Sequence, residues 1–257
     1  MSPRRLPWRV LLAAAALAFA SGCATVAPGS APATAQAANP ADPWENWNRK
    51  VFAFNEAIDE AVLKPVAQAY RDAVPQMVRT GVGNFFGNIG DVWSAANHFL
   101  QGKVGSGFEM GMRVLTNTLF GLGGVLDPAT EMRLPRRSED FGQTLGVWGL
   151  PAGPYIVLPL LGPSSVRDTA GLPLDRYATM SSHVVDAEAW SMSVLQLVNV
   201  RAELLATTQL LSDVSLDKYS FLRDGYLSRR RDQVYDGAPP LEKFEDEFAD
   251  PPPKKGN

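Results

Sequence analysis

Cysteine and histidine are nearly absent from this sequence of 257 residues, which holds one Cys and two His. A single thiol cannot form an intrachain disulfide, and Cys-rich zinc sites need several thiolates. We expect His98 and His183 to be structural side chains, so no metal centre is predicted. The net charge of −3, from 24 Lys and Arg against 27 Asp and Glu, excludes a strongly basic nucleic-acid-binding protein.

The sequence also lacks the short motifs of common catalytic sites. There is no G-x-S-x-G elbow for a lipase nucleophile, no H-E-x-x-H or C-x-x-C pair and no G-x-x-x-x-G-K-[ST] phosphate loop. We therefore predict neither an enzyme nor a cofactor. No apolar run after residue 22 reaches ~18 residues, so we expect no transmembrane helix.

The N-terminal residues predict export and lipidation. Three arginines among the first nine residues precede the apolar run Val10–Ala20, whose 11 residues are fewer than the ~20 that a membrane span needs. The residues up to Cys23 then resemble a bacterial lipobox, with Ala20 standing where Leu is usual. We predict that residues 1–22 are a lipoprotein signal peptide and that Cys23 carries acyl chains. The alternative is an exported protein with an unpaired thiol.

Two segments have the composition of flexible chain. Residues 23–41 are built mainly from Ala, Pro, Thr, Gly and Ser, and are predicted to be a tether between the lipid anchor and the body. Residues 238–257 are charged and Pro-rich, and are predicted to be a disordered tail. The folded domain is therefore expected over residues 42–237.

Apolar residues at helical spacing predict that this domain is all-α. The first helix begins near Trp44 behind an Asp42-Pro43 cap, and Pro65 is expected to end or kink it. The other helices are expected at Val66–Ala73, Gln76–Leu100, Val104–Leu122, from after Ser182 to about Leu211, and Leu216–Tyr235.

Glycines interrupt two of these helices, although each interior Gly costs ~1 kcal/mol relative to Ala. They indicate close helix packing or flexibility, and simple loop punctuation is the alternative.

The segment Leu150–Pro163 is apolar and contains four prolines, which bar a regular helix or a central strand. We expect irregular backbone that is buried, lies at a lipid interface or lines a cavity. Ser164 and Ser165 are expected to cap a helix that begins near Val166. The charges of Asp140, Arg167 and Asp168 are expected to form an internal ion pair and caps rather than a catalytic group.

Three stretches of the domain together resemble the MlaA/VacJ family of outer-membrane lipoproteins of intermembrane phospholipid transport. They are Asp42-Pro43-Trp44-Glu45 with Asn48-Arg49, Phe52-x-Phe54-Asn55 and Lys64-Pro65-Val66; Asp140-Phe141-Gly142-Gln143-Thr144-Leu145-Gly146 with Trp148-Gly149, Gly153-Pro154-Tyr155, Leu158-Pro159, Gly162-Pro163-Ser164 and Arg167-Asp168; and Arg201-Ala202 with Leu204-Leu205, Asp217, Tyr219, Arg223-Asp224 and Tyr226. The resemblance covers nearly the whole body.

The resemblance implies a single ring-like (donut-shaped) helical domain embedded at the inner leaflet of the outer membrane. Phospholipid would leave the outer leaflet through an amphipathic channel, pass to a soluble periplasmic carrier and so maintain lipid asymmetry. Some members associate with trimeric porins. Ala24 after the lipidated Cys favours the outer membrane, and the tryptophans at positions 44, 47, 93, 148 and 190 suit a membrane interface.

A phospholipid path needs polar groups for the head and an apolar wall for the tails. We therefore choose Phe52, Asn55, Tyr155, Arg167 and Asp168 as candidates for that path. The alternative is that these residues only hold the ring together. Two other functions remain open at this point: a lipid-modifying enzyme, and a structural envelope lipoprotein that conducts no lipid.

Overall fold

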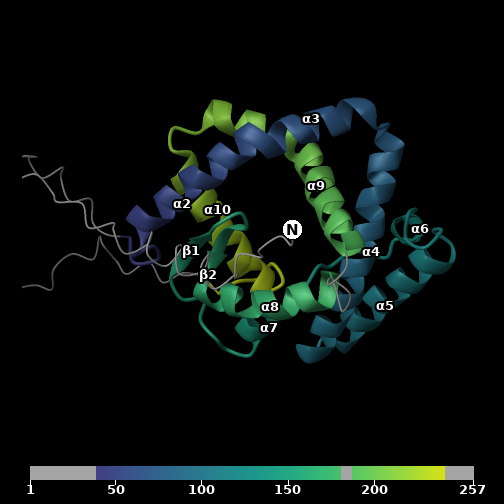
Figure 1. Ribbon diagram of the computed structural model, residues 1–257. Coiled ribbons are helices and arrows are strands. Elements are labelled where there is room, and N and C mark those ends of the chain that lie inside the picture. Colours follow the sequence, from purple (N-terminus) through teal and green to yellow (C-terminus); the bar gives the residue numbers. More distant parts are fainter. Residues whose placement is uncertain (1–38, 181–186, 241–257) are drawn as a thin grey trace, which may run out of the picture. The chain divides into compact units, whose positions relative to one another are not determined.

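The computed structural model describes residues 39–180 and 187–240. Cys23, the signal peptide, most of the tether, His183 and the tail beyond residue 240 lie outside the described residues. The elements are α2 (Glu45–Ile58), the π-helical turn η1 (Asp59–Leu63), α3 (Lys64–Ala73), α4 (Gln76–Leu100), α5 (Val104–Leu119), α6 (Pro128–Glu131), α7 (Phe141–Val147), β1 (Tyr155–Leu158), β2 (Gly162–Ser165), α8 (Val166–Met180), α9 (Ala187–Val214) and α10 (Lys218–Val234) (Figure 1).

The predicted all-α class is confirmed, because helices make up nearly all of the regular structure described. The one sheet of the described residues is the hairpin of β1 and β2. Over the same residues, no helix combines the length and the hydropathy of a membrane span.

Within the unit that begins at Asn39, the elements follow one another in a closed circuit. α2 continues through η1 into α3, and Pro75 separates α3 from α4. α4 then contacts α7 and α8, which contact α10 and β2 respectively, and β1 contacts α2 and so returns to the start. α9 packs on both α3 and α4, and α5 packs along α4 (Figure 1). This order of contacts is the ring-like arrangement that we expected.

Two predicted helices begin where expected. α4 spans Gln76–Leu100 because Pro75 takes an extended conformation before it and Gly102 adopts a positive φ of 76° after it. α5 begins at Val104 and ends at Leu119.

Close packing explains some of the interior glycines of these helices but not others. A Cβ at Gly107 would lie 2.8 Å from the Phe99 ring, so this glycine permits close packing of α5 on α4. A Cβ at Gly105 or Gly111 would meet nothing within 4 Å, so packing does not explain those two.

The first helix begins near Trp44 as predicted, but the role of Asp42 differs from the prediction, and the helical path changes near Pro65 without ending there. Asp42 does not cap α2 with its side chain; its carboxylate is buried and accepts hydrogen bonds from Asn48 and Tyr219. Pro65 does not end the helical path, which continues to Ala73. The wider η1 turn directly before Pro65 accommodates a residue that has no N–H to donate.

The segment Leu150–Pro163 is more regular than predicted. Residues Tyr155–Leu158 pair in antiparallel register with Gly162–Ser165. Pro163 is the one proline inside a strand, and it lies in β2, an edge strand of this two-stranded sheet, where a missing N–H is tolerated. Ser165 caps the next helix as expected, since its Oγ accepts a hydrogen bond from the Asp168 N–H at 3.2 Å.

Two asparagines of α2 complete the outer edge of β1. Asn48 donates to the Tyr155 carbonyl at 3.1 Å and accepts from the Val157 N–H at 2.9 Å. Two helical turns later, Asn55 donates to the Leu158 carbonyl at 3.0 Å and accepts from the Leu160 N–H at 2.8 Å. An isolated hairpin is marginal in water, and these amides take the place of a third strand.

Candidate functional site

The burial pattern of this domain is inverted relative to an ordinary globular protein. Among the described residues, buried polar and charged side chains outnumber buried hydrophobic ones, while large hydrophobic side chains are exposed on most helices. Scattered exposed hydrophobics are normal, but extended apolar surface marks a membrane or partner interface.

Helix α5 shows the inversion most clearly. Its exposed side carries apolar residues at helical spacing, namely Val104, Phe108, Met112, Leu115 and Leu119. Its buried side carries polar residues beside Met110, namely Arg113, Thr116 and Asn117. A helix with this polarity suits apolar surroundings outside and a polar interior.

An ion network satisfies the buried side of α5. The Arg113 guanidinium donates to Asp91 of α4 at 3.2 Å and to the Leu134 carbonyl at 2.7 Å, and it also pairs with Asp127. Burial raises the pKa of Asp91, although Arg136 and Arg113 both oppose the shift. The network therefore anchors α5 and the following loop to α4 without an apolar core.

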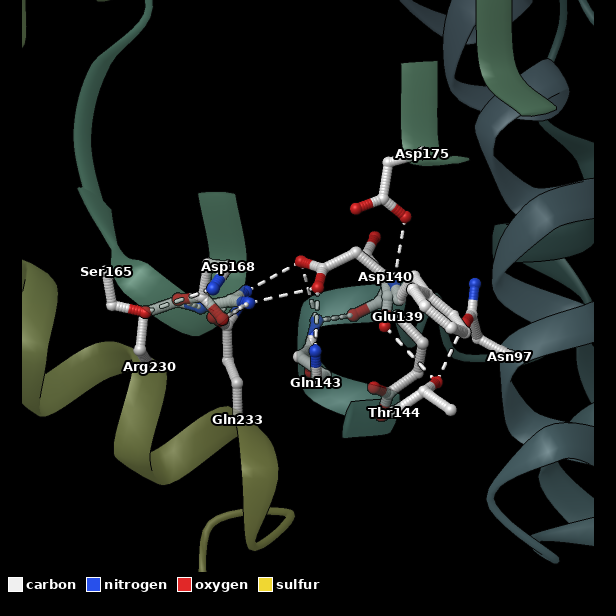
Figure 2. Close-up of polar contacts among 12 residues, drawn as sticks. Asn97, Glu139, Asp140, Gln143, Thr144, Ser165, Asp168, Asp175, Arg230 and Gln233 are labelled. Atoms are coloured by element: carbon white, nitrogen blue, oxygen red, sulfur yellow. Dashed lines mark hydrogen bonds and ion pairs between the residues drawn. The ribbon is translucent and has the colours of Figure 1, made fainter. Parts of the chain in front are cut away.

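A second polar cluster joins α7, α8 and α10 (Figure 2). The Arg230 guanidinium forms two hydrogen bonds to the Asp140 carboxylate, at 2.6 and 2.9 Å, and its Nε donates to Asp168 at 3.0 Å. Asp140 also accepts the Gln143 N–H at 2.8 Å, which caps α7. Arg230 of α10 therefore links Asp140, the N-cap of α7, to Asp168 in the first turn of α8.

Asp168 receives two further donors. The Tyr226 hydroxyl donates at 2.6 Å, and Arg167 Nε donates at 3.0 Å. Burial would raise the pKa of Asp168, but the bonds and charge of Arg230, together with the Tyr226 bond and the charge of Arg167, outweigh burial and lower that pKa to about 2. Burial, with the Asp168 bond next, raises the pKa of the Tyr226 hydroxyl. A carboxylate with this pKa is ionised near neutral pH, so it has no proton to donate as a general acid, and it is a weak general base.

A cavity of about 1,040 Å³ lies beside this cluster. Arg167, Asp168 and Arg230 line it with charged groups, and Leu150, Leu227 and Val234 line it with apolar ones. Its wall therefore offers both of the surfaces that an amphipathic molecule requires.

The structure gathers three of the five predicted path residues near this cavity. Arg167 and Asp168 line it, and the buried Tyr155 ring packs 5.9 Å from the ring of Tyr226, another lining residue. Phe52 packs on Tyr219 instead, with ring centroids 5.7 Å apart, and Asn55 holds the hairpin turn.

The ion pair predicted among Asp140, Arg167 and Asp168 is confirmed for Arg167 with Asp168, but the sequence prediction missed Arg230. Arg230 is not among the candidate residues chosen from the sequence. Tyr219, Arg223, Tyr226 and Arg230 recur at helical spacing along α10, and this pattern could have indicated one shared face.

Comparison with known proteins places these features in a family. A family model described as MlaA lipoprotein matches residues 40–233. The intermembrane phospholipid transport system lipoprotein MlaA of Escherichia coli strain K12 is 37% identical over 199 residues, covering 73% of this chain and 76% of the relative. The protein of the same name from Haemophilus influenzae is 31% identical over 210 residues, covering 79% and 83%.

One solved structure has a similar fold, with a TM-score of 0.67 and 36% sequence identity. It comes from work on the structural basis for maintenance of bacterial outer membrane lipid asymmetry. The match covers 75% of this chain and 98% of that chain. The closed circuit of helices, the polar interior and these matches lead to one conclusion: the chain belongs to the MlaA lipoprotein family.

Proposed function

We propose that this chain is an outer-membrane lipoprotein of intermembrane phospholipid transport. It removes phospholipid from the outer leaflet through an amphipathic channel and passes it to a periplasmic carrier, which maintains lipid asymmetry. The inverted burial of the domain carries the proposal, because an apolar exterior around buried charges suits a body that lies in lipid and contacts head groups inside. The names of its relatives support the same role.

The cavity beside α10 suits part of the lipid path. Arg167 offers a guanidinium toward a phosphate, while Arg230 holds Asp140 and Asp168 in the same wall, and Leu150 and Val234 offer apolar surface to the tails. The other three candidates do not line the cavity. They support its wall by holding the hairpin against α2 and α10, and they are Tyr155, Phe52 and Asn55. Transfer breaks no covalent bond, so no nucleophile and no cofactor are required.

The acyl chains on Cys23 hold the body at the periplasmic face of the outer membrane, and the tether up to residue 41 gives it reach. The apolar exterior then decides how the body lies in the leaflet. A trimeric porin is a further partner to test, because a barrel wall in the same membrane could also cover part of this exterior.

Complementation tests the proposal directly. The chain is expressed in an Escherichia coli K12 strain that lacks its own MlaA, and surface-exposed phospholipid is measured by its hydrolysis with an added phospholipase. We expect exposed phospholipid to return to the level of the parent strain. Normal protein abundance with no decrease in exposed phospholipid would contradict the proposal.

A second measurement separates the other functions. Native mass spectrometry of the detergent-extracted, lipidated protein is expected to show copurifying intact phospholipid. Lysolipid or free fatty acid formed on incubation would indicate a lipid-modifying enzyme. Repeated absence of bound lipid in mild detergents would favour a structural lipoprotein.

A further inference from the structure

A separate groove of about 410 Å³ lies at the N-terminal half of α4, away from the polar cluster. Helix α4 contributes Val78, Val82 and Phe85, the loop after α5 contributes Val125, and α9 contributes Leu195. All of its lining residues are apolar or glycine. No part of the transport path described above uses this groove.

The backbone at the wall of the groove has hydrogen-bond partners outside it. A Cβ at Gly81 would lie 2.9 Å from Val125 Cγ1, so this glycine allows the loop to close against α4. Asn84 donates to the Val125 carbonyl at 3.1 Å and so satisfies the exposed backbone of that loop. The groove therefore presents side-chain hydrocarbon.

This chemistry excludes most occupants. A charged head group would lose its hydration and find no partner in the groove. An extended peptide would leave its N–H and C=O groups unpaired there, and the groove is too small to enclose a helix, which is ~10 Å across. Cavities for small ligands span ~300–1,000 Å³, and 410 Å³ lies at the lower end of that range. A single flexible hydrocarbon chain fits these limits.

We propose that the groove seats one acyl chain of the transported phospholipid, an inference that rests on the proposed function. The mouth of the groove supports this occupant, because Met77 is 85% exposed and Val78, Leu126 and Met192 are also exposed. A chain can thus enter from an apolar surface without crossing a polar rim. Methionine adapts to flexible ligands, which suits tails of different length.

The test is photocrosslinking of the full lipidated protein in vesicles of phosphatidylethanolamine that carries a diazirine in one acyl chain. Crosslinked peptides are then mapped by mass spectrometry. We expect labelling within residues 77–86 and at Met192 or Leu195. Val78→Trp fills the groove and should reduce this labelling at least several-fold. Val92→Trp is the matched control, because it lies on the same helix, is 56% exposed against 53% for Val78 and does not line the groove.

The outcomes separate this inference from the proposed function. Labelling confined to other helices, or labelling that Val78→Trp leaves intact, overturns the acyl-chain site but leaves transport standing. No labelling anywhere, together with failed complementation, overturns both. Labelling of the groove only in a Cys23→Ser variant would assign it to the protein's own anchor chain and would also overturn the inference.

Discussion

At the scale of single residues, the arrangement of Arg230 has the largest consequence for stability. One guanidinium neutralises two carboxylates, Asp140 and Asp168, that belong to different helices. Removing one member of a buried ion pair leaves an uncompensated charge, which costs more than the pair itself contributes.

Arg230→Gln should lower the free energy of unfolding by ~3–5 kcal/mol, because two carboxylates lose their common partner. Chemical denaturation of the detergent-solubilised protein measures the change. Arg229→Gln is the control, since the neighbouring Arg229 is exposed and should shift the unfolding free energy by less than ~0.5 kcal/mol. Equal effects of the two variants would show that the cluster does not stabilise the fold.

The same cluster predicts a pH dependence. Burial alone would raise the pKa of Asp140 and Asp168, but Arg230 and the other donors to these carboxylates together lower both, that of Asp168 to about 2, with Arg230 the main opposing group. Because an unfolded Asp titrates near ~3.9, the stabilisation is fully present above ~pH 4 and is lost as the pH falls toward ~2. The unfolding free energies of the parent protein and Arg230→Gln should therefore converge in acid. The raised pKa of Asp91 contributes equally to the pH dependence of both proteins, so it cancels in the difference between their unfolding free energies. A gap that is constant with pH would exclude the Arg230 pairing.

The sequence could indicate that Asp140, Arg167 and Asp168 are structural, since charges beside Pro and Gly in an apolar region need partners. It could not indicate that Arg230 is the partner. Arg230 lies 62 residues after Asp168 and 90 after Asp140, so only the tertiary fold brings them together. The same holds for Asp42, which looks like a local cap but bonds to Tyr219 across 177 residues.

At the scale of elements, local signals predicted the starts of the helices well. Pro75 marks the start of α4, and Ser165 marks that of α8. The β-hairpin was missed because four prolines argue against a sheet, and its stability comes from the side chains of Asn48 and Asn55 on α2. Propensity describes each strand alone, so it cannot include a helix that replaces a neighbouring strand.

Periodicity predicted that α5 is helical but not which side faces inward, because the apolar side of a helix is normally assumed to be buried. The structure buries Arg113 and exposes Leu115. The inverted polarity of α5 therefore predicts a direct contact with lipid.

Leu115→Glu should weaken association with zwitterionic vesicles by at least about tenfold, since burial of a Leu side chain contributes ~1.5–3 kcal/mol. The unfolding free energy should hardly change, because Leu115 is exposed. Co-sedimentation is measured in a Cys23→Ser background, so that acyl chains do not dominate binding. Lys50→Gln makes the net charge more negative by the same single unit, at an exposed site, and should bind like the parent. Unchanged association of Leu115→Glu would place the lipid contact elsewhere.

At the scale of the whole domain, the closed circuit depends on a seam between its first and last helices. Arg49 of α2 pairs with Asp217, and Arg223 of α10 pairs with the buried Asp42 at 3.4 Å. The Tyr219 hydroxyl reaches the same carboxylate at 2.5 Å. The apolar clusters are small, so polar bonds across this seam have an unusually large share in keeping the domain together.

Arg223→Met tests whether the circuit is one cooperative unit. Loss of the guanidinium leaves Asp42 with fewer donors and should cost ~3 kcal/mol. Because α10 also contacts α7 and β2, amide protection should fall together in α2, β1 and α7 when hydrogen exchange is measured. Arg201→Met breaks a different ion pair, with Asp59, which joins α9 to η1 outside the seam. Its effect should stay within α9 and α3, because α9 packs on the circuit without closing it. If Arg223→Met increased exchange only within α10, the two ends of the chain would be held independently and the circuit would have no cooperative role.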